Sequence, residues 1–134
     1  MATTSIVAFG EEYFDHVPTA ALLKIVKSKK PYDIQDIVYS VWYNRAVPMN
    51  KNLRTLCFPP DKDSLQVWMG DEWRPRLIDE IIQRMIETVV QRAHERLEKD
   101  ISEEDAKWLL SIPSMRGREY TLLCKGIRTF IFSF

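Results

Sequence analysis

Histidine, glycine and cysteine are scarce in this chain of 134 residues, which has two histidines, four glycines and two cysteines. Neither His16 nor His94 has a serine, cysteine or acidic residue at a spacing typical of a catalytic pair. No segment supplies the three or four converging ligands of a metal site, and no group of glycines forms a phosphate-binding loop. The sequence therefore predicts no catalytic residue, no metal site, no cofactor and no small-molecule substrate, which makes an enzyme the least favoured class.

Long apolar runs and an excess of charge are also missing. No run approaches the roughly 20 apolar residues that span a bilayer, and the first residues lack the basic start and apolar core of a signal peptide. The 19 basic and 19 acidic side chains cancel, so the overall field that draws basic proteins to nucleic acid or anionic membranes is absent. Cys57 and Cys124 belong to no Cys-x-x-Cys motif and are expected to be buried, reduced thiols. These absences predict no membrane partner and a setting in the cytoplasm, the nucleus or a virion.

The length and composition are those of one globular domain, residues 1–134, with 46% hydrophobic and 28% charged residues. Three short apolar runs separated by turn residues predict an antiparallel meander of three strands, within residues 53–58, 64–70 and 72–77. Pro75 has no backbone N–H, so the last strand is expected either to lie at an edge of the sheet or to be already leaving it. Before the meander, residues 5–17 are interpreted as a short strand or an extended arm that ends near Gly10.

Apolar residues at helical spacing predict about five helices that flank this sheet, in residues 20–30, 34–44, 77–99, 102–112 and 118–134. Asp33 and Ser102 are the expected caps of the second and fourth helices. The last segment could pass for a strand, but its apolar residues fall on one helical face, with Gly126 as a weak point worth about 1 kcal/mol. The predicted fold class is α+β.

Residues 43–54, "YNRAVPMNKNLR", form a polar stretch between the second helix and the sheet. It could be an active site, a binding loop or a stiff connection, and the residue types favour the connection. Asparagine tolerates turn geometry and bonds to nearby backbone, and proline fixes one backbone dihedral. The residues that mark this loop are Asn44, Pro48, Asn50 and Asn52.

Basic residues are unevenly spread, which indicates a candidate patch for phosphate groups. Exposed tryptophan beside arginine could add base stacking at Trp73, although packing within the hairpin is the more common role of such a residue. The candidate nucleic-acid patch comprises Lys24, Lys27, Lys29, Lys30, Arg74 and Arg76.

The carboxyl-terminal "TFIFSF" is strongly apolar. Such a segment is expected to be covered, either by the chain's own core or by another protein molecule. The candidate protein interface comprises Phe130, Ile131, Phe132 and Phe134.

Three stretches together resemble a domain of unknown function that recurs in proteins of giant nucleocytoplasmic DNA viruses, often after a zinc-finger-like segment. They are "VAFGEEYFDHV" with its Phe-Gly-x-Glu core, the Asn/Pro-rich "IVYSVWYNRAVPMNKNLR", and the hairpin "VWMGDEWRPR" with Gly70 and Trp73. The family usually has an acidic residue and a histidine where this chain has Met49 and Lys51. The resemblance implies a viral origin and a domain that acts by binding.

Two hypotheses follow. The first is a non-enzymatic protein-interaction or structural module of a large DNA virus, such as a virion component, that binds a partner protein or itself. The alternative is a nucleic-acid-binding module that uses the lysine and arginine patch.

Overall fold

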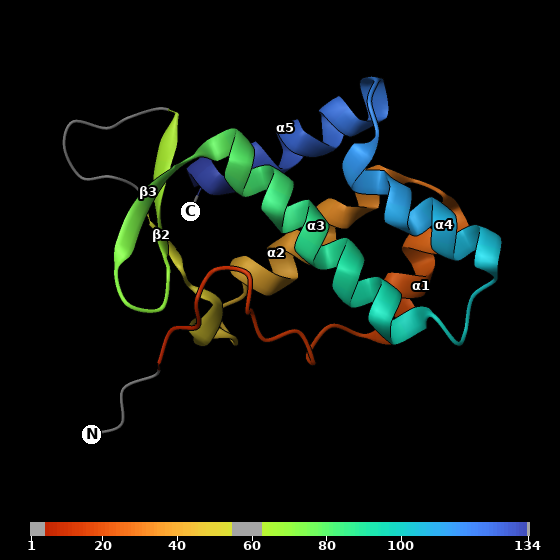
Figure 1. The fold of residues 1–134 in the computed structure, drawn as a ribbon, viewed down its shortest axis with the longest axis horizontal. Coiled ribbons are helices and arrows are strands. Elements are labelled where there is room, and N and C mark those ends of the chain that lie inside the picture. The colour runs from red at the N-terminus through yellow and green to blue at the C-terminus, as the bar shows by residue number, and fades with distance from the viewer. Residues whose placement is uncertain (1–4, 55–62, 134) are drawn as a thin grey trace.

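The computed structural model describes residues 5–54 and 63–133. Within them it has five α-helices and a three-stranded antiparallel sheet, which confirms the predicted α+β fold (Figure 1). The helices are α1 (Thr19–Ser28), α2 (Ile34–Trp42), α3 (Ile78–Leu97), α4 (Glu103–Ser111) and α5 (Arg118–Ser133). The strands are β1 (Leu53–Arg54), β2 (Ser64–Trp68) and β3 (Trp73–Leu77), and short 3-10 turns lie at Pro31–Asp33, Pro48–Asn50 and Ile112–Ser114. Cys57 and Phe134 lie outside the described residues.

Helix α3 crosses the middle of the molecule and contacts all four other helices and β3 (Figure 1). One face of it is apolar along its whole length, as the sequence predicted, and is fully buried. A buried aliphatic side chain contributes about 1.5–3 kcal/mol relative to an exposed one, so this face is the largest single part of the core. Its residues are Ile78, Ile81, Ile82, Met85, Ile86, Val89, Val90, Ala93 and Leu97.

The sheet has the order β1-β2-β3. Side chains alternate between its two faces, and Leu65 and Val67 of β2 are buried on the face that belongs to the core. Pro75 on β3 pairs with Gln66 on β2. In the described part of the sheet β3 is an edge strand, as predicted.

One of the two predicted helix caps is correct. The Ser102 hydroxyl accepts a hydrogen bond from the Asp105 amide at 3.1 Å at the start of α4. Asp33 does not cap α2, because a 3-10 turn precedes the helix and the Asp33 carboxylate instead accepts a hydrogen bond from the Ser28 hydroxyl at 3.1 Å.

The carboxyl-terminal segment is helical, as its pattern predicted, and Leu123, Ile127 and Ile131 of α5 are buried in the core. Gly126 lies against α2: a Cβ atom there would lie 2.2 Å from the Gln35 Oε1 atom. The glycine therefore leaves room for the end of the Gln35 side chain of α2 against α5. None of the helices in the described part of the chain is long and apolar enough to cross a membrane.

Candidate functional site

The segment before α1 is an extended arm that joins the asparagine-rich loop to the sheet. The Val7 amide donates to the Met49 carbonyl at 2.9 Å, and the Phe9 amide donates to the Trp68 carbonyl at 2.8 Å. The arm thus contacts both the loop after α2 and the end of β2, which are adjacent in space but not in sequence.

A buried carboxylate anchors this arm. Glu12 is only 2% exposed, and its carboxylate accepts hydrogen bonds from the Gly10 amide at 3.0 Å, the Trp42 indole at 3.1 Å and the Asn52 side-chain amide at 2.6 Å. A buried charge is tolerated when several donors satisfy its oxygens. The acidic residue of the Phe-Gly-x-Glu core is therefore part of the internal structure.

The loop asparagines are also structural. Asn50 is fully buried and pairs with the backbone of Tyr13: its Oδ1 atom accepts from the Tyr13 amide at 2.8 Å and its Nδ2 atom donates to the Tyr13 carbonyl at 2.7 Å. Asn44 bonds locally, to the Ala46 amide at 2.9 Å, and Pro48 begins a 3-10 turn. Asn50 and the buried Asn52 hold the arm through these hydrogen bonds, with Asn52 bonding through its Nδ2 atom.

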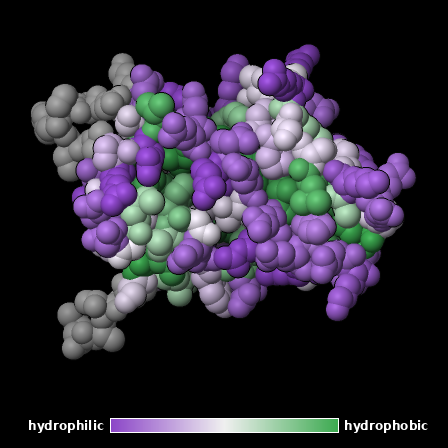
Figure 2. Space-filling model, in the orientation of Figure 1, coloured by the Kyte–Doolittle hydropathy of each residue, from purple (hydrophilic) through white to green (hydrophobic). Residues whose placement is uncertain are grey.

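A surface pocket of about 610 Å³ lies between the β2–β3 hairpin and the first half of α3. Its floor is apolar and consists of Phe9 from the arm, Val67 and Met69 from β2 and the residue after it, and Ile81 from α3. Figure 2 shows hydrophobic surface between the hairpin and the centre of the molecule, bordered by hydrophilic groups. This volume falls within the range of about 300–1,000 Å³ that is typical of ligand sites.

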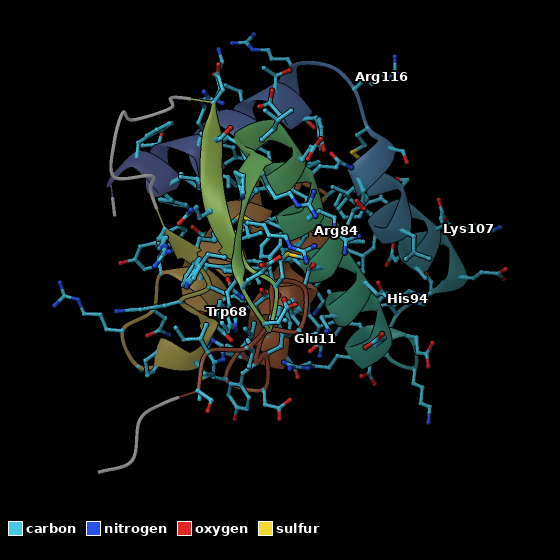
Figure 3. The ribbon with its side chains drawn as sticks, turned by 60° about the vertical axis from the view of Figure 1, so that its left-hand side comes forward. Glu11, Trp68, Arg84, His94, Lys107 and Arg116 are labelled. Atoms are coloured by element: carbon cyan, nitrogen blue, oxygen red, sulfur yellow. The ribbon has the colours of Figure 1, made fainter. Side chains whose placement is uncertain are left out.

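The rim of this pocket is charged. Arg76, Asp79, Glu80 and Arg84 line it and are exposed. Asp79 accepts a hydrogen bond from Arg128 at 3.4 Å, whereas Arg76 and Arg84 have no ion-pair partner among the described residues. Figure 3 shows Arg84 on α3 near the hairpin, away from Lys107 and Arg116.

The sequence did not identify this pocket as a site. Its residues come from the arm, the hairpin and α3, so they are brought together only by the tertiary structure. A signal was present in β2, where alternation predicts that Val67 and Met69 point to the same face as Leu65.

The structure does not bring the candidate nucleic-acid residues into one patch. Lys24 and Lys27 lie on α1 and Lys30 follows it, all exposed, while Arg74 and Arg76 lie on β3 at the opposite end of the molecule (Figure 1). Lys29 forms an ion pair with Asp105 and lies over the Trp108 ring, 4.8 Å from its centroid. The two groups of basic residues therefore do not form one continuous surface.

Trp73 does not share a face with its neighbouring arginines. Its ring packs on Trp68, with 5.6 Å between centroids, and the Arg54 guanidinium lies 4.1 Å from its centroid. Arg74 and Arg76 point to the other face of β3 because side chains alternate along a strand. Gly70 forms the tight turn of this hairpin with φ of +99°, a conformation that favours glycine.

The candidate interface residues of α5 lie in different environments. The Phe130 ring contacts Tyr39, with 5.4 Å between centroids, and Ile131 is buried. Phe132 is 54% exposed, and the Arg128 guanidinium lies 5.5 Å from its ring centroid. Phe134 lies outside the described residues, so Phe132 is the member of this group that the structure places at the surface.

The one described cysteine, Cys124, is free but only partly buried, short of the burial expected from the sequence. Burial raises the pKa of the Cys124 thiol, which reduces the thiolate fraction near neutral pH. In residues 5–54 and 63–133, no cluster of three histidine, cysteine or acidic side chains is placed to hold a metal ion.

No protein-family model matches the chain, and no curated protein and no solved structure matches it.

Proposed function

We propose that this domain is a non-enzymatic protein-interaction module and that its pocket between the hairpin and α3 receives an apolar side chain of a partner protein. The observation that carries this proposal is the combination of an apolar floor, which is buried at Val67 and Ile81 and partly buried at Phe9 and Met69, with an exposed, charged rim. Protein interfaces commonly have this arrangement, in which an apolar anchor enters a pocket that polar groups surround.

The proposal includes a viral setting, such as the interior of a virion. Its support is the resemblance of the arm, loop and hairpin stretches to a domain of giant DNA viruses. In this structure the Glu12 carboxylate bonds to Asn52, so the arm and loop stretches form one structural unit. Such a unit is consistent with a structural scaffold that holds the neighbouring pocket open to a partner.

A peptide-library selection tests the interaction role. Random peptides displayed on phage are selected against the full chain, and the enriched sequences are synthesised with a fluorescent label for anisotropy measurements. We expect peptides with a large apolar side chain that bind the unmodified protein and bind the Met69→Arg variant at least about tenfold more weakly, because the arginine fills the pocket and brings a charge onto its floor.

A matched control separates the pocket from general surface effects. Leu122→Arg makes the same kind of change at a 43% exposed position on α5, and we expect it to leave peptide binding unchanged. Circular dichroism checks that both variants are folded. If Met69→Arg is unfolded, amide shifts of Met69 and Ile81 in the unmodified protein locate the bound peptide instead. Peptides that bind equally to all variants, or that shift only distant amides, would contradict the proposal.

The nucleic-acid alternative rests on Lys24, Lys27 and Lys30, which are exposed and have no ion-pair partner among the described residues. It predicts binding of a labelled single strand or duplex that weakens steeply with salt. Replacement of Lys27, Lys29 and Lys30 together by glutamine should then abolish the binding. Binding that does not change in this triple variant would exclude the lysine patch.

A further inference from the structure

A second hollow lies beside the apolar pocket along α3. This hollow has a volume of about 320 Å³, is lined mainly by polar groups, and shares Arg84 with the pocket. The two together extend along α3 from Asp79 to Glu95. Sixteen residues of helix span about 24 Å, which matches about seven residues of extended peptide. We call the pocket and the hollow together the groove. Its length exceeds that of a typical small molecule and suits a short segment of protein.

The charges along this groove are not symmetric. At the apolar end, the pairing of Asp79 with Arg128 leaves Arg76 and Arg84 facing a single further carboxylate, that of Glu80. In the polar hollow, with Arg84 already counted at the apolar end, Arg92 alone faces the two glutamates Glu87 and Glu95. The excess of positive charge thus lies beside the apolar floor.

Arg84 lies at the junction of the apolar pocket and the polar hollow. Its guanidinium lies over Gly10, where a Cβ atom would be 3.8 Å from the Arg84 Nη2 atom. A guanidinium binds a carboxylate through two parallel hydrogen bonds, which gives direction as well as affinity.

We infer that the partner is a short protein segment in which a large apolar side chain is flanked by carboxylates. This inference rests on the interaction role proposed above. The apolar side chain fills the pocket over Phe9, Val67, Met69 and Ile81, and the adjacent carboxylates meet Arg76 and Arg84. The rest of the segment follows α3 toward Glu95.

Three labelled peptides of about nine residues test the inference. All have a central leucine–phenylalanine pair, and the flanks are aspartate in the first, serine in the second and lysine in the third. At near-physiological salt, we expect the aspartate peptide to bind at least about tenfold more tightly than the serine peptide, and the lysine peptide to bind most weakly.

Charge reversal on the rim gives the decisive comparison. Arg84→Glu should weaken binding of the aspartate peptide by at least about tenfold and remove its advantage over the lysine peptide. The control Arg118→Glu makes the same change at an exposed position on α5 and should change neither affinity. If the affinity of the aspartate peptide is the same for Arg84→Glu as for the unmodified protein, the inference is overturned.

The remaining outcomes distinguish this inference from the proposed function. If serine and lysine peptides bind as tightly as the aspartate peptide, and Met69→Arg still abolishes binding, the interaction role stands and the acidic partner does not. If no peptide binds and the library selection yields none that Met69→Arg weakens, both fail.

Two further results would identify another occupant of the groove and overturn the inference. The first is that the protein binds dodecanoate and none of the peptides, which would identify a small amphiphile. The second is self-association that Arg84→Glu abolishes, which would identify a second copy of the chain.

Discussion

The Glu12 carboxylate lies 2.6 Å from the Asn52 side-chain nitrogen, although 40 positions separate the two residues in the chain. This contact links the arm before α1 to the loop after α2. Both side chains are buried, so the contact serves the stability of the fold. Because Phe9 of the same arm forms part of the pocket floor, the contact also helps to hold that part of the floor of the proposed binding site in place.

Removal of the buried carboxylate should destabilise the protein strongly. Glu12→Ala leaves the Trp42 indole and the Asn52 amide as buried donors without this acceptor. Each unsatisfied donor costs about 1–3 kcal/mol, so we expect the free energy of unfolding in urea to fall by about 2–6 kcal/mol. The neighbouring Glu11 is exposed, and Glu11→Ala should change it by less than about 0.5 kcal/mol. Equal effects of the two substitutions would contradict this role of Glu12.

Asn50 should matter more than Asn44, although both belong to the loop signature. Asn50→Ala removes two hydrogen bonds to Tyr13 at a fully buried position, and we expect a loss of about 2–3 kcal/mol. Asn44→Ala removes one exposed bond to Ala46, for which about 0.5–1 kcal/mol is expected. Hydrogen exchange of the Tyr13 amide gives an independent measurement, because that amide donates to Asn50. Its exchange should accelerate in Asn50→Ala and stay slow in Asn44→Ala.

The parts of this fold that were predictable are those whose signal is local. The period of apolar residues in α3, the serine cap of α4 and the edge position of Pro75 depend on neighbours within a few positions, and each prediction is confirmed. The pairing of Asn50 with Tyr13 spans 37 positions, and no local pattern contains it. The same holds for the pocket, whose floor comes from three separate segments. The Asp33 prediction was wrong because a 3-10 turn, which a capping pattern does not reveal, precedes α2.

Alkaline pH should destabilise the fold through two tyrosines. Burial raises the pKa of Tyr120 to about 12 and raises that of Tyr43 as well, whereas both ionise near pH 10 in an unfolded chain. The folded state therefore favours the neutral phenols, and the stability they contribute is complete below about pH 10 and is lost as the pH rises toward about 12. Urea unfolding at a series of pH values should show this decline, with a smaller slope in Tyr120→Phe. A slope that is unchanged in that variant would contradict the assignment.

Arg96 should hold the end of the arm against α3. Its guanidinium donates to the Phe14 carbonyl at 3.0 Å and also to the Val17 carbonyl, and it lies 5.4 Å from the Phe14 ring centroid. Hydrogen bonds from a charged donor contribute about 1.5–3 kcal/mol each, so Arg96→Met, which keeps the aliphatic stem, should lower the free energy of unfolding by about 3–6 kcal/mol.

The control for this substitution is Arg92→Met, one turn earlier on α3, where the arginine has no ion-pair partner among the described residues. We expect that variant to lose less than about 0.5 kcal/mol. Hydrogen exchange separates a local from a global effect: amides of residues 14–17 should exchange faster in Arg96→Met under conditions where the core of α3 stays protected. If the whole molecule exchanged at one increased rate instead, Arg96 would support the entire fold and the arm would have no separate attachment.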